Sequence, residues 1–271
     1  MIDSNTQLYC IFGNPVRHSK SPAIHNACFR QHRINAVYLA FEIDKISKGI
    51  TAMKTLNIKG ASVTIPFKES IMNHLDWIDE DALNIGAVNT VVNKDGKLLG
   101  YNTDYKAAIS PLKPIGIKDK RVCIIGAGGA ARAVAYGLHK RKGNLVIINR
   151  NKERGESLAL KYKADFIPMS ETDKMDDITA DIIINTTPLG MSPDVEKSAF
   201  PSNQMNSQMV VMDIVYNPLR TKLLSEAQKK GCTTIDGLSM FLYQGAAQFK
   251  LWTGISPDIE LMRQTMINGD N

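Results

Sequence analysis

The chain has 271 residues, of which 44% are hydrophobic and 22% are charged, and its formal net charge at pH 7 is +6. These values are typical of a globular protein with a sizeable buried core, and the length allows one large domain or two modest ones. The lysines and arginines are scattered and form no long basic run, which disfavours nucleic acid as a partner and favours anionic small molecules.

The cysteines and the N-terminal residues exclude further classes. The four cysteines lie far apart without any C-x-x-C pair, so the sequence predicts neither a zinc site nor a redox dithiol, and Cys10 and Cys123 are expected to be small core residues. No basic segment followed by an apolar core opens the chain, and no stretch resembles a membrane span. We therefore expect a cytoplasmic protein without a metal or a membrane contact, and the sequence leaves open whether it is a monomer or a homodimer.

The first part of the chain alternates strand-like and helix-like segments. Strands are expected at 8–12, 37–41 and 61–65, and helices at 23–32 and 46–56. This alternation predicts a parallel or mixed sheet with helical cover.

Two serines precede the first expected helix. Ser21 suits the N-cap position and Pro22 suits the first helical position. Ser19 and Ser21 also place two hydroxyls beside cations at a helix start, which is a ready site for a carboxylate. The residues alone do not decide between these interpretations.

Polar residues also follow the later strands of this region. Lys68 comes just past the strand at 61–65, where α/β sheets place ligands, although an ordinary surface lysine is the simpler interpretation. A strand at 87–92 and a hairpin turn containing Asp95-Gly96 follow. Asn89 could satisfy backbone groups near this turn, and Asp104 could cap the next helix.

A glycine-rich turn marks the start of the second part of the chain. The apolar run 122–125 predicts a buried strand, and Gly126 permits a tight turn out of it. Gly128 lets the backbone approach a pyrophosphate at the N-terminus of the following helix, and Ala131 takes the place of the usual third glycine. A purely structural glycine turn is the alternative.

The next strand, at 145–148, completes a βαβ unit and indicates which dinucleotide would bind. An NAD site carries Asp or Glu after this strand, for the ribose hydroxyl. This chain has Asn149 and Arg150, followed by Lys152 and Arg154. These cations favour a 2′-phosphate and therefore NADP over NAD, although they could also form a solvated basic turn.

The remaining elements continue the alternation. Strands are expected at 181–185, 209–214 and 233–235, with a helix at 221–230, and the ends of these strands should meet at the cofactor edge of a doubly wound sheet. A final helical region begins after Gly237 and contains Gln244 as a polar residue, which by itself suggests only a helix surface position.

Six short motifs, in this order and over nearly the whole chain, resemble the shikimate dehydrogenase family. They are Ser19-Lys20-Ser21-Pro22 with His25-Asn26, Val63-Thr64-Ile65-Pro66-Phe67-Lys68, Gly86-Ala87-Val88-Asn89-Thr90, Tyr101-Asn102-Thr103-Asp104, Asn185-Thr186-Thr187-Pro188-Leu189-Gly190-Met191, and Asp236-Gly237-Leu238 through Gln244. The resemblance implies two α/β domains with a cleft between them: a mixed substrate-binding domain over 1–104, completed by C-terminal helices at 238–271, and a Rossmann-like doubly wound NADP-binding domain over 105–237.

The resemblance also assigns roles to individual residues. It implies that Ser19 and Ser21 bind the substrate carboxylate, and that Lys68 and Asp104 form the catalytic pair. The other implied substrate-binding residues are Thr64, Asn89, Tyr216 and Gln244. The implied cofactor-binding residues are Gly126, Ala127, Gly128, Gly129, Ala130, Asn149, Arg150, Arg154, Thr187, Gly237 and Met240. One departure is Asn151, where many members have threonine, and its side chain can still form a hydrogen bond.

The implied reaction is the reversible, NADP-dependent reduction of 3-dehydroshikimate to shikimate, in aromatic amino acid biosynthesis. In this hypothesis the Lys68 ammonium supplies a proton to the ketone oxygen and Asp104 orients Lys68. A broader quinate/shikimate dehydrogenase using NAD or NADP is the nearest alternative, but Ser19 and Ser21 favour shikimate because quinate carries an extra ring hydroxyl. A non-catalytic NADP(H)-binding regulator is disfavoured by the presence of both Lys68 and Asp104, and a methylenetetrahydrofolate dehydrogenase-like enzyme fits the serine site poorly.

Overall fold

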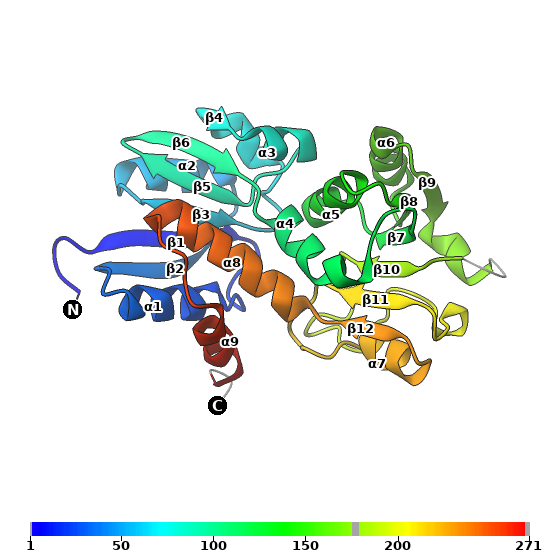
Figure 1. The fold of residues 1–271 in the computed structure, drawn as a ribbon. Helices are drawn as coiled ribbons and strands as arrows, with labels where there is room; N and C mark the ends of the chain where they lie inside the picture. Colours follow the sequence, from blue (N-terminus) through cyan, green and yellow to red (C-terminus); the bar gives the residue numbers. More distant parts are fainter. Residues whose placement is uncertain (1, 175–178, 269–271) are drawn as a thin grey trace. The chain divides into compact units, whose positions relative to one another are not determined.

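The computed structural model describes residues 2–174 and 179–268. Contacts within this part of the chain define two compact units. The first unit comprises the residues up to Thr103 together with those from Leu242 onward, and the second unit is Asp104–Phe241. Each unit contains its own six-stranded sheet (Figure 1).

The sheet of the first unit is mixed, as predicted. Its strand order is β2-β1-β3-β5-β6-β4, in which β1 is parallel to β2 and β3, whereas β5 is antiparallel to β3 and β6. The bounds are β1 (Gln7–Gly13), β2 (Ala36–Glu42), β3 (Gly60–Val63), β4 (Trp77–Ile78), β5 (Thr90–Lys94) and β6 (Lys97–Tyr101). The predicted hairpin is confirmed: Asp95 and Gly96 join β5 to β6 with positive φ angles of 52° and 87°.

Several helices accompany this sheet. They are α1 (Ser21–Gln31), α2 (Ile46–Thr55), α3 (Glu80–Ile85) and α9 (Ile259–Asn268), with a 3₁₀ helix, η1 (Ser70–His74). The long helix α8 (Gly237–Thr253) begins in the second unit and ends in the first. Strand residues such as Phe12, Val63 and Val91 form a core with Met53 of α2 and Ile71 of η1.

Backbone hydrogen bonds explain why one strand of this sheet ends earlier than predicted and another begins later. The strand predicted to reach residue 65 ends at Val63, because Phe67 N donates to Thr64 O and closes a turn. The strand predicted from residue 87 begins at Thr90, because Val88 N donates to Lys68 O instead of to a strand neighbour. Ala87 and Val88 are buried without being in a strand, so their apolar character marks the core and not the element.

The sheet of the second unit is entirely parallel. Its strand order is β12-β11-β10-β7-β8-β9, and the bounds are β7 (Arg121–Ile125), β8 (Asn144–Asn149), β9 (Asp165–Pro168), β10 (Ile182–Asn185), β11 (Val210–Asp213) and β12 (Thr233–Ile235). Counted from β7, this is the 3-2-1-4-5-6 order of the doubly wound dinucleotide-binding fold, with its switch point between β7 and β10. The predicted fold class is therefore confirmed.

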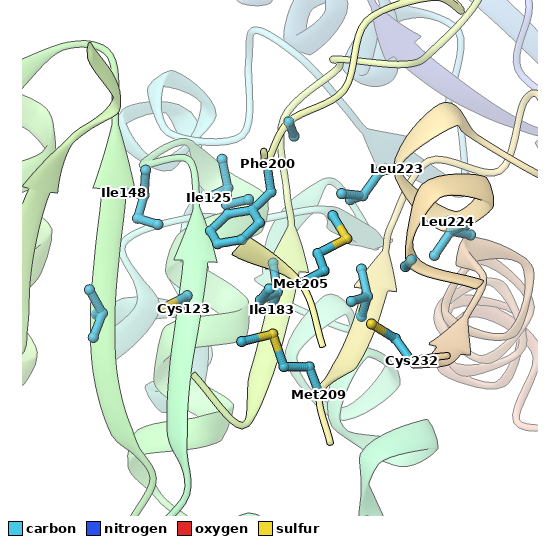
Figure 2. Close-up of a cluster of buried hydrophobic side chains, with 14 of the residues drawn as sticks. Cys123, Ile125, Ile148, Ile183, Phe200, Met205, Met209, Leu223, Leu224 and Cys232 are labelled. Carbon is cyan, nitrogen blue, oxygen red and sulfur yellow. The ribbon is translucent and has the colours of Figure 1, made fainter. Parts of the chain in front are cut away.

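The second unit also contains α4 (Asp104–Ile109), α5 (Gly129–His139), α6 (Lys152–Tyr162) and α7 (Lys222–Lys229), with the 3₁₀ helices η2 (Ser110–Ile115), η3 (Met169–Lys174) and η4 (Ser202–Gln204). Figure 2 shows the core beside α7, where strand residues such as Ile125 and Ile183 face Phe200, Met205 and Leu223. Cys10 and Cys123 are fully buried, as predicted for small core residues. No helix in the described ranges is long and apolar enough to cross a membrane.

Candidate active site

Four predicted substrate-binding residues and the predicted catalytic Lys68 lie at one edge of the sheet of the first unit. The parallel strands β1 and β3 end at this edge, whereas the antiparallel strand β5 begins there. The loop after β1, the turn after β3 and the segment before β5 are therefore neighbours in the fold. These three segments carry Ser19, Ser21, Thr64, Lys68 and Asn89.

The two serines are linked to each other at the start of α1. Ser21 N donates to Ser19 Oγ at 3.2 Å, and Ser21 itself is buried. The prediction that Ser21 is the N-cap was wrong: Lys20 takes that place, Ser21 is the first helical residue, and no side chain caps the helix in the usual way. Because the Ser19 oxygen accepts the Ser21 N–H, the pair is held together by an interaction that still leaves Ser19 a hydroxyl hydrogen to donate.

Thr64 and Lys68 are held in place by backbone contacts on both sides. Thr64 N donates to Phe12 O at 2.9 Å, and Lys68 O accepts from Val88 N at 2.8 Å. Gly13 is required for this arrangement, because a Cβ at this position would lie 2.4 Å from Thr64 Cγ2. The turn that carries Lys68 is therefore tied to the segment that leads into Asn89.

Asn89 is 2% exposed, and its side chain takes part in several buried hydrogen bonds. Its Oδ1 accepts from Thr103 N at 2.8 Å and from Thr90 Oγ1 at 2.7 Å, and its Nδ2 donates to Thr103 Oγ1 at 2.9 Å. The carboxamide is thus held in one orientation.

Gln244 lies on the part of α8 that belongs to the first unit, and it is half-buried. The next residue, Gly245, lets α8 approach α1 closely, because a Cβ there would lie 2.9 Å from Ile24 Cδ1. One turn further along α8, Gln248 donates from Nε2 to the backbone oxygen of Asn89 at 3.1 Å. The packing of α8 therefore links Gln244 to the strand edge that carries Asn89.

Asp104 is the first residue of α4 and of the second unit, and it is buried. It directly follows Thr103, the residue that hydrogen-bonds the Asn89 side chain. Helix α4 packs against α5 with the help of Gly137, where a Cβ would lie 2.6 Å from Ile109 Cγ1.

The glycine turn of the second unit lies at the switch point of its sheet. Gly126 follows β7 with φ of +119°, and a Cβ there would lie 2.5 Å from Thr186 Oγ1, after β10. Gly128 differs: its φ is −84°, it is exposed, and a Cβ there would meet nothing within 4 Å. Helix α5 then begins at Gly129, so its free N–H groups lie beside this turn, together with Ala127 and Ala130.

The basic segment after β8 is the beginning of a helix and not only a turn. Asn151 is the N-cap of α6, and its Oδ1 accepts from Arg154 N at 2.9 Å. Asn149 Nδ2 donates to Asn151 O, and both Arg150 and Arg154 are exposed. The asparagine at position 151 therefore supplies the capping hydrogen bond for which threonine is also suited.

The ends of β10 and β11 carry a buried polar cluster that the sequence interpretation missed. Asp213 is fully buried, and its carboxylate accepts from Asn185 Nδ2 at 3.0 Å and from Thr221 Oγ1 at 2.7 Å. Asn185 Oδ1 in turn accepts from both Thr187 N and Thr187 Oγ1. Burial raises the Asp213 pKa to about 6, opposed by these hydrogen bonds. A charged residue at the end of the apolar run 209–212 was the signal that could have revealed it.

The start of α8 lies against the segment after β11. Gly237 has no room for a side chain, because a Cβ would lie 2.5 Å from Ile214 O and 2.6 Å from Val215 O. Met240 is buried one turn further on, and Phe241 stacks on Tyr216 with ring centroids 4.3 Å apart. Gly237, Met240 and Tyr216 are thus all close to the carboxyl end of β11. Within the described residues, no group of three or more His, Cys, Asp or Glu side chains could hold a metal ion.

Comparisons with known proteins match nearly the whole chain. Residues 11–91 match the shikimate dehydrogenase substrate binding domain, residues 110–239 match the shikimate/quinate 5-dehydrogenase family, and residues 237–267 match the shikimate 5′-dehydrogenase C-terminal domain. The shikimate dehydrogenase (NADP(+)) of Pyrococcus furiosus is 46% identical, over 98% of this chain and 97% of the relative.

Solved structures agree with the sequence comparison. A crystal structure of shikimate dehydrogenase in complex with NADP+ has a TM-score of 0.92 and 43% identity, and the match covers 100% of this chain and 98% of that chain. The shikimate 5-dehydrogenase of Thermus thermophilus, solved with NADP(H) and shikimate, has a TM-score of 0.86 and 33% identity, with 97% and 99% covered. The chain belongs to the shikimate dehydrogenase family.

Proposed function

We propose that this protein is an NADP-dependent shikimate dehydrogenase, which catalyses the reversible reduction of 3-dehydroshikimate to shikimate in aromatic amino acid biosynthesis. The observation that carries this proposal is the glycine turn at the switch point of the second unit, combined with the hydroxyl, amide and lysine side chains at one sheet edge of the first. The relatives named shikimate dehydrogenase (NADP(+)), and one solved with NADP(H) and shikimate, support it.

Gly128 gives the strongest support for a bound dinucleotide. Neither its φ of −84° nor its surroundings require glycine, since a Cβ would meet nothing within 4 Å. Glycine is expected at such a position when a ligand must approach the backbone closely. A pyrophosphate at the N-terminus of α5 would accept hydrogen bonds from its free N–H groups and be favoured by the helix dipole.

The cations at the start of α6 support NADP as the form of the dinucleotide. Lys152 and Arg154 lie in the first turn of this helix, where the helix dipole disfavours positive charge. An anion bound there offsets that cost, and Arg150 and Arg154 are both exposed and able to donate several hydrogen bonds to a 2′-phosphate. We therefore assign these two arginines to the phosphate that distinguishes NADP from NAD.

The chemistry divides between the cofactor and the protein. When bound, NADPH supplies the hydride that reduces the ketone carbon. We assign Lys68 the role of proton donor to the ketone oxygen as that oxygen gains negative charge, because an ammonium group can donate both a hydrogen bond and a proton. The proposal requires Asp104 to hold the hydroxyl that forms from the ketone, and Asn89 and Gln244 to bind the other ring hydroxyls. Ser19 and Ser21 would bind the carboxylate.

A stoichiometric assay tests this function. Purified protein is incubated with 3-dehydroshikimate and NADPH, the loss of NADPH absorbance is followed, and shikimate is quantified by chromatography. We expect one shikimate for each NADPH consumed. Binding of NADPH without any consumption would contradict the proposal and favour a non-catalytic NADP(H)-binding regulator.

We further propose that the enzyme works in the cytoplasm, as a monomer or a homodimer. Light scattering on the purified protein distinguishes the two oligomeric states, and fractionation of cells tests the location.

A further inference from the structure

A line of buried hydrogen bonds in the first unit ends at Asn89. Tyr38 Oη donates to Ser62 Oγ at 2.6 Å, and Ser62 Oγ donates to Gln248 Oε1 at 2.7 Å. Gln248 Nε2 donates to Thr90 Oγ1 at 3.0 Å, and Thr90 Oγ1 donates to Asn89 Oδ1 at 2.7 Å. All five side chains are at most 4% exposed.

Backbone groups fix the direction of these hydrogen bonds. Gln248 Nε2 also faces the backbone oxygen of Asn89 at 3.1 Å, and a carbonyl oxygen can only accept. Asn89 Oδ1 also faces Thr103 N at 2.8 Å, and a backbone N–H can only donate. Both carboxamides therefore have a single orientation, and the hydroxyls of Ser62 and Thr90 have only one direction in which to donate.

These hydrogen bonds also fix which end of the Asn89 carboxamide donates. Because Gln248 Nε2 donates to Thr90 Oγ1, the Thr90 hydrogen is directed to Asn89 Oδ1, and Oδ1 is held as an acceptor. The other end of the side chain, Nδ2, is then fixed as the donor, and it donates to Thr103 Oγ1 at 2.9 Å. Orienting a polar group before the substrate arrives lowers the cost of binding and reaction.

We propose that Gln248 is a positioning residue that, through Thr90, reinforces the orientation in which the backbone N–H of Thr103 holds the Asn89 carboxamide, so that its Nδ2 end serves as donor to a substrate hydroxyl. This inference rests on the proposed function, in which Asn89 binds a hydroxyl of the polyhydroxylated ring. Gln248 acts from the buried face of α8, one turn beyond Gln244, and has no contact with substrate in this proposal.

Replacing Gln248 with glutamate gives a specific test, because the two side chains have the same shape. A glutamate carboxylate only accepts, so it cannot donate to Thr90, whereas a protonated carboxyl has one donor and one acceptor and can replace the amide. Burial raises the pKa of a carboxyl, so the protonated form is restored as the pH falls. The titratable side chains near position 248 include Tyr38 of β2 and His25 of α1, and burial lowers the pKa of His25 to about 3 in the unchanged protein.

The measurement is the ratio of kcat/KM for shikimate between Gln248→Glu and the unchanged protein, from pH 6 to pH 9. At pH 9 we expect the kcat/KM of the variant to be about ten- to hundredfold lower than that of the unchanged protein, because a buried donor is lost and its acceptors are left unsatisfied. The ratio should recover as the pH falls. Calorimetry on cofactor-free protein should show the same loss in shikimate affinity. NADP affinity should stay within about twofold of the unchanged protein, because the proposal assigns NADP to the second unit.

A second pair of variants keeps the test informative if the buried glutamate prevents folding. Thr90→Val removes the hydroxyl that links Gln248 to Asn89 and keeps the side-chain shape, whereas Thr90→Ser retains the hydroxyl. We expect the valine variant to lose shikimate affinity and the serine variant to keep most of it. Gln264→Glu, on the exposed surface of α9, is the control for a new charge on the same unit and should have no effect.

The outcomes separate this inference from the proposed function. Absence of shikimate turnover by the unchanged protein would contradict the proposed function. If that protein is active and Thr90→Val matches it, or if folded Gln248→Glu shows a loss that is the same at every pH, the positioning role of Gln248 is overturned.

Discussion

Replacing Gly128 with alanine should separate cofactor binding from stability. The backbone at Gly128, with φ −84° and ψ −172°, is accessible to alanine, and the added Cβ meets nothing within 4 Å. The unfolded chain has fewer conformations with alanine than with glycine, which stabilises the folded protein by about 0.4–1 kcal/mol. Alanine is, however, a poorer N-cap than glycine by a similar amount. We expect these effects to cancel to within about 1 kcal/mol, a change in Tm of about 3 °C at most.

Cofactor binding should respond differently. In the proposed function the pyrophosphate approaches the N-terminus of α5 through the space that this Cβ would occupy. We therefore expect NADP affinity to fall at least about tenfold, or about 1.4 kcal/mol. Calorimetric titration with NADP measures the affinity, and circular dichroism during heating measures Tm.

Gly126→Ala is the matched comparison in the same turn. Its φ of +119° is strained for alanine, and its Cβ would lie 2.5 Å from Thr186 Oγ1, which donates to Ile125 O at 2.6 Å. Strain costs about 1–3 kcal/mol and the disturbed hydrogen bond costs about 1 kcal/mol more, so Tm should fall by at least about 5 °C. The reasoning is refuted if Gly128→Ala binds NADP as tightly as the unchanged protein, or if it loses as much stability as Gly126→Ala.

Three further predictions concern catalysis, cofactor choice and acid stability. Lys68→Ala should lower kcat by about 10²–10⁴-fold with a much smaller change in KM, and near-normal kcat in steady-state assays would remove Lys68 from its assigned role. The double variant Arg150→Ala and Arg154→Ala should have a kcat/KM with NADP at least about tenfold lower, and a kcat/KM with NAD that is nearly unchanged. An equal loss with both cofactors would show that the arginines do not bind the 2′-phosphate. Burial lowers the His25 pKa to about 3, below its unfolded value of 6.5, so stability is complete above about pH 6.5 and falls by about 1.4 kcal/mol per pH unit as the solution is acidified toward pH 3. Between pH 7 and pH 4.5 the free energy of unfolding of His25→Phe, measured with denaturant, should therefore fall by about 2–3 kcal/mol less than that of the unchanged protein. Equal decreases for the two proteins would contradict a buried neutral imidazole at His25.

Much of the fold follows from local sequence patterns because its strands are short apolar runs bounded by turn residues. The parallel strands β7, β8 and β10 are buried on both faces, so their sequences are continuous apolar runs rich in β-branched residues. The glycine turn after β7 carried the cofactor prediction in the same way, because Gly126 and Gly128 stand at a strand-to-helix junction.

The parts that escaped prediction depend on contacts between distant residues. In the sequence, Gln248 is one more polar residue on a predicted helix. Its hydrogen-bond partners Ser62 and Asn89 lie more than a hundred residues away in sequence. Asp213 likewise gains its partners Asn185 and Thr221 only when β10 and β11 pair. The spacing of residues along the chain does not predict such contacts.

The most direct test of the proposed activity is the rate of NADPH formation, followed by absorbance, with shikimate or quinate as substrate and NADP or NAD as oxidant. We predict strong turnover with shikimate and NADP and little with the three other combinations. The proposed function assigns the arginines after β8 to the 2′-phosphate and the two serines to a substrate without the extra ring hydroxyl of quinate. Comparable turnover with quinate or with NAD would contradict this specificity and indicate a broader quinate/shikimate dehydrogenase.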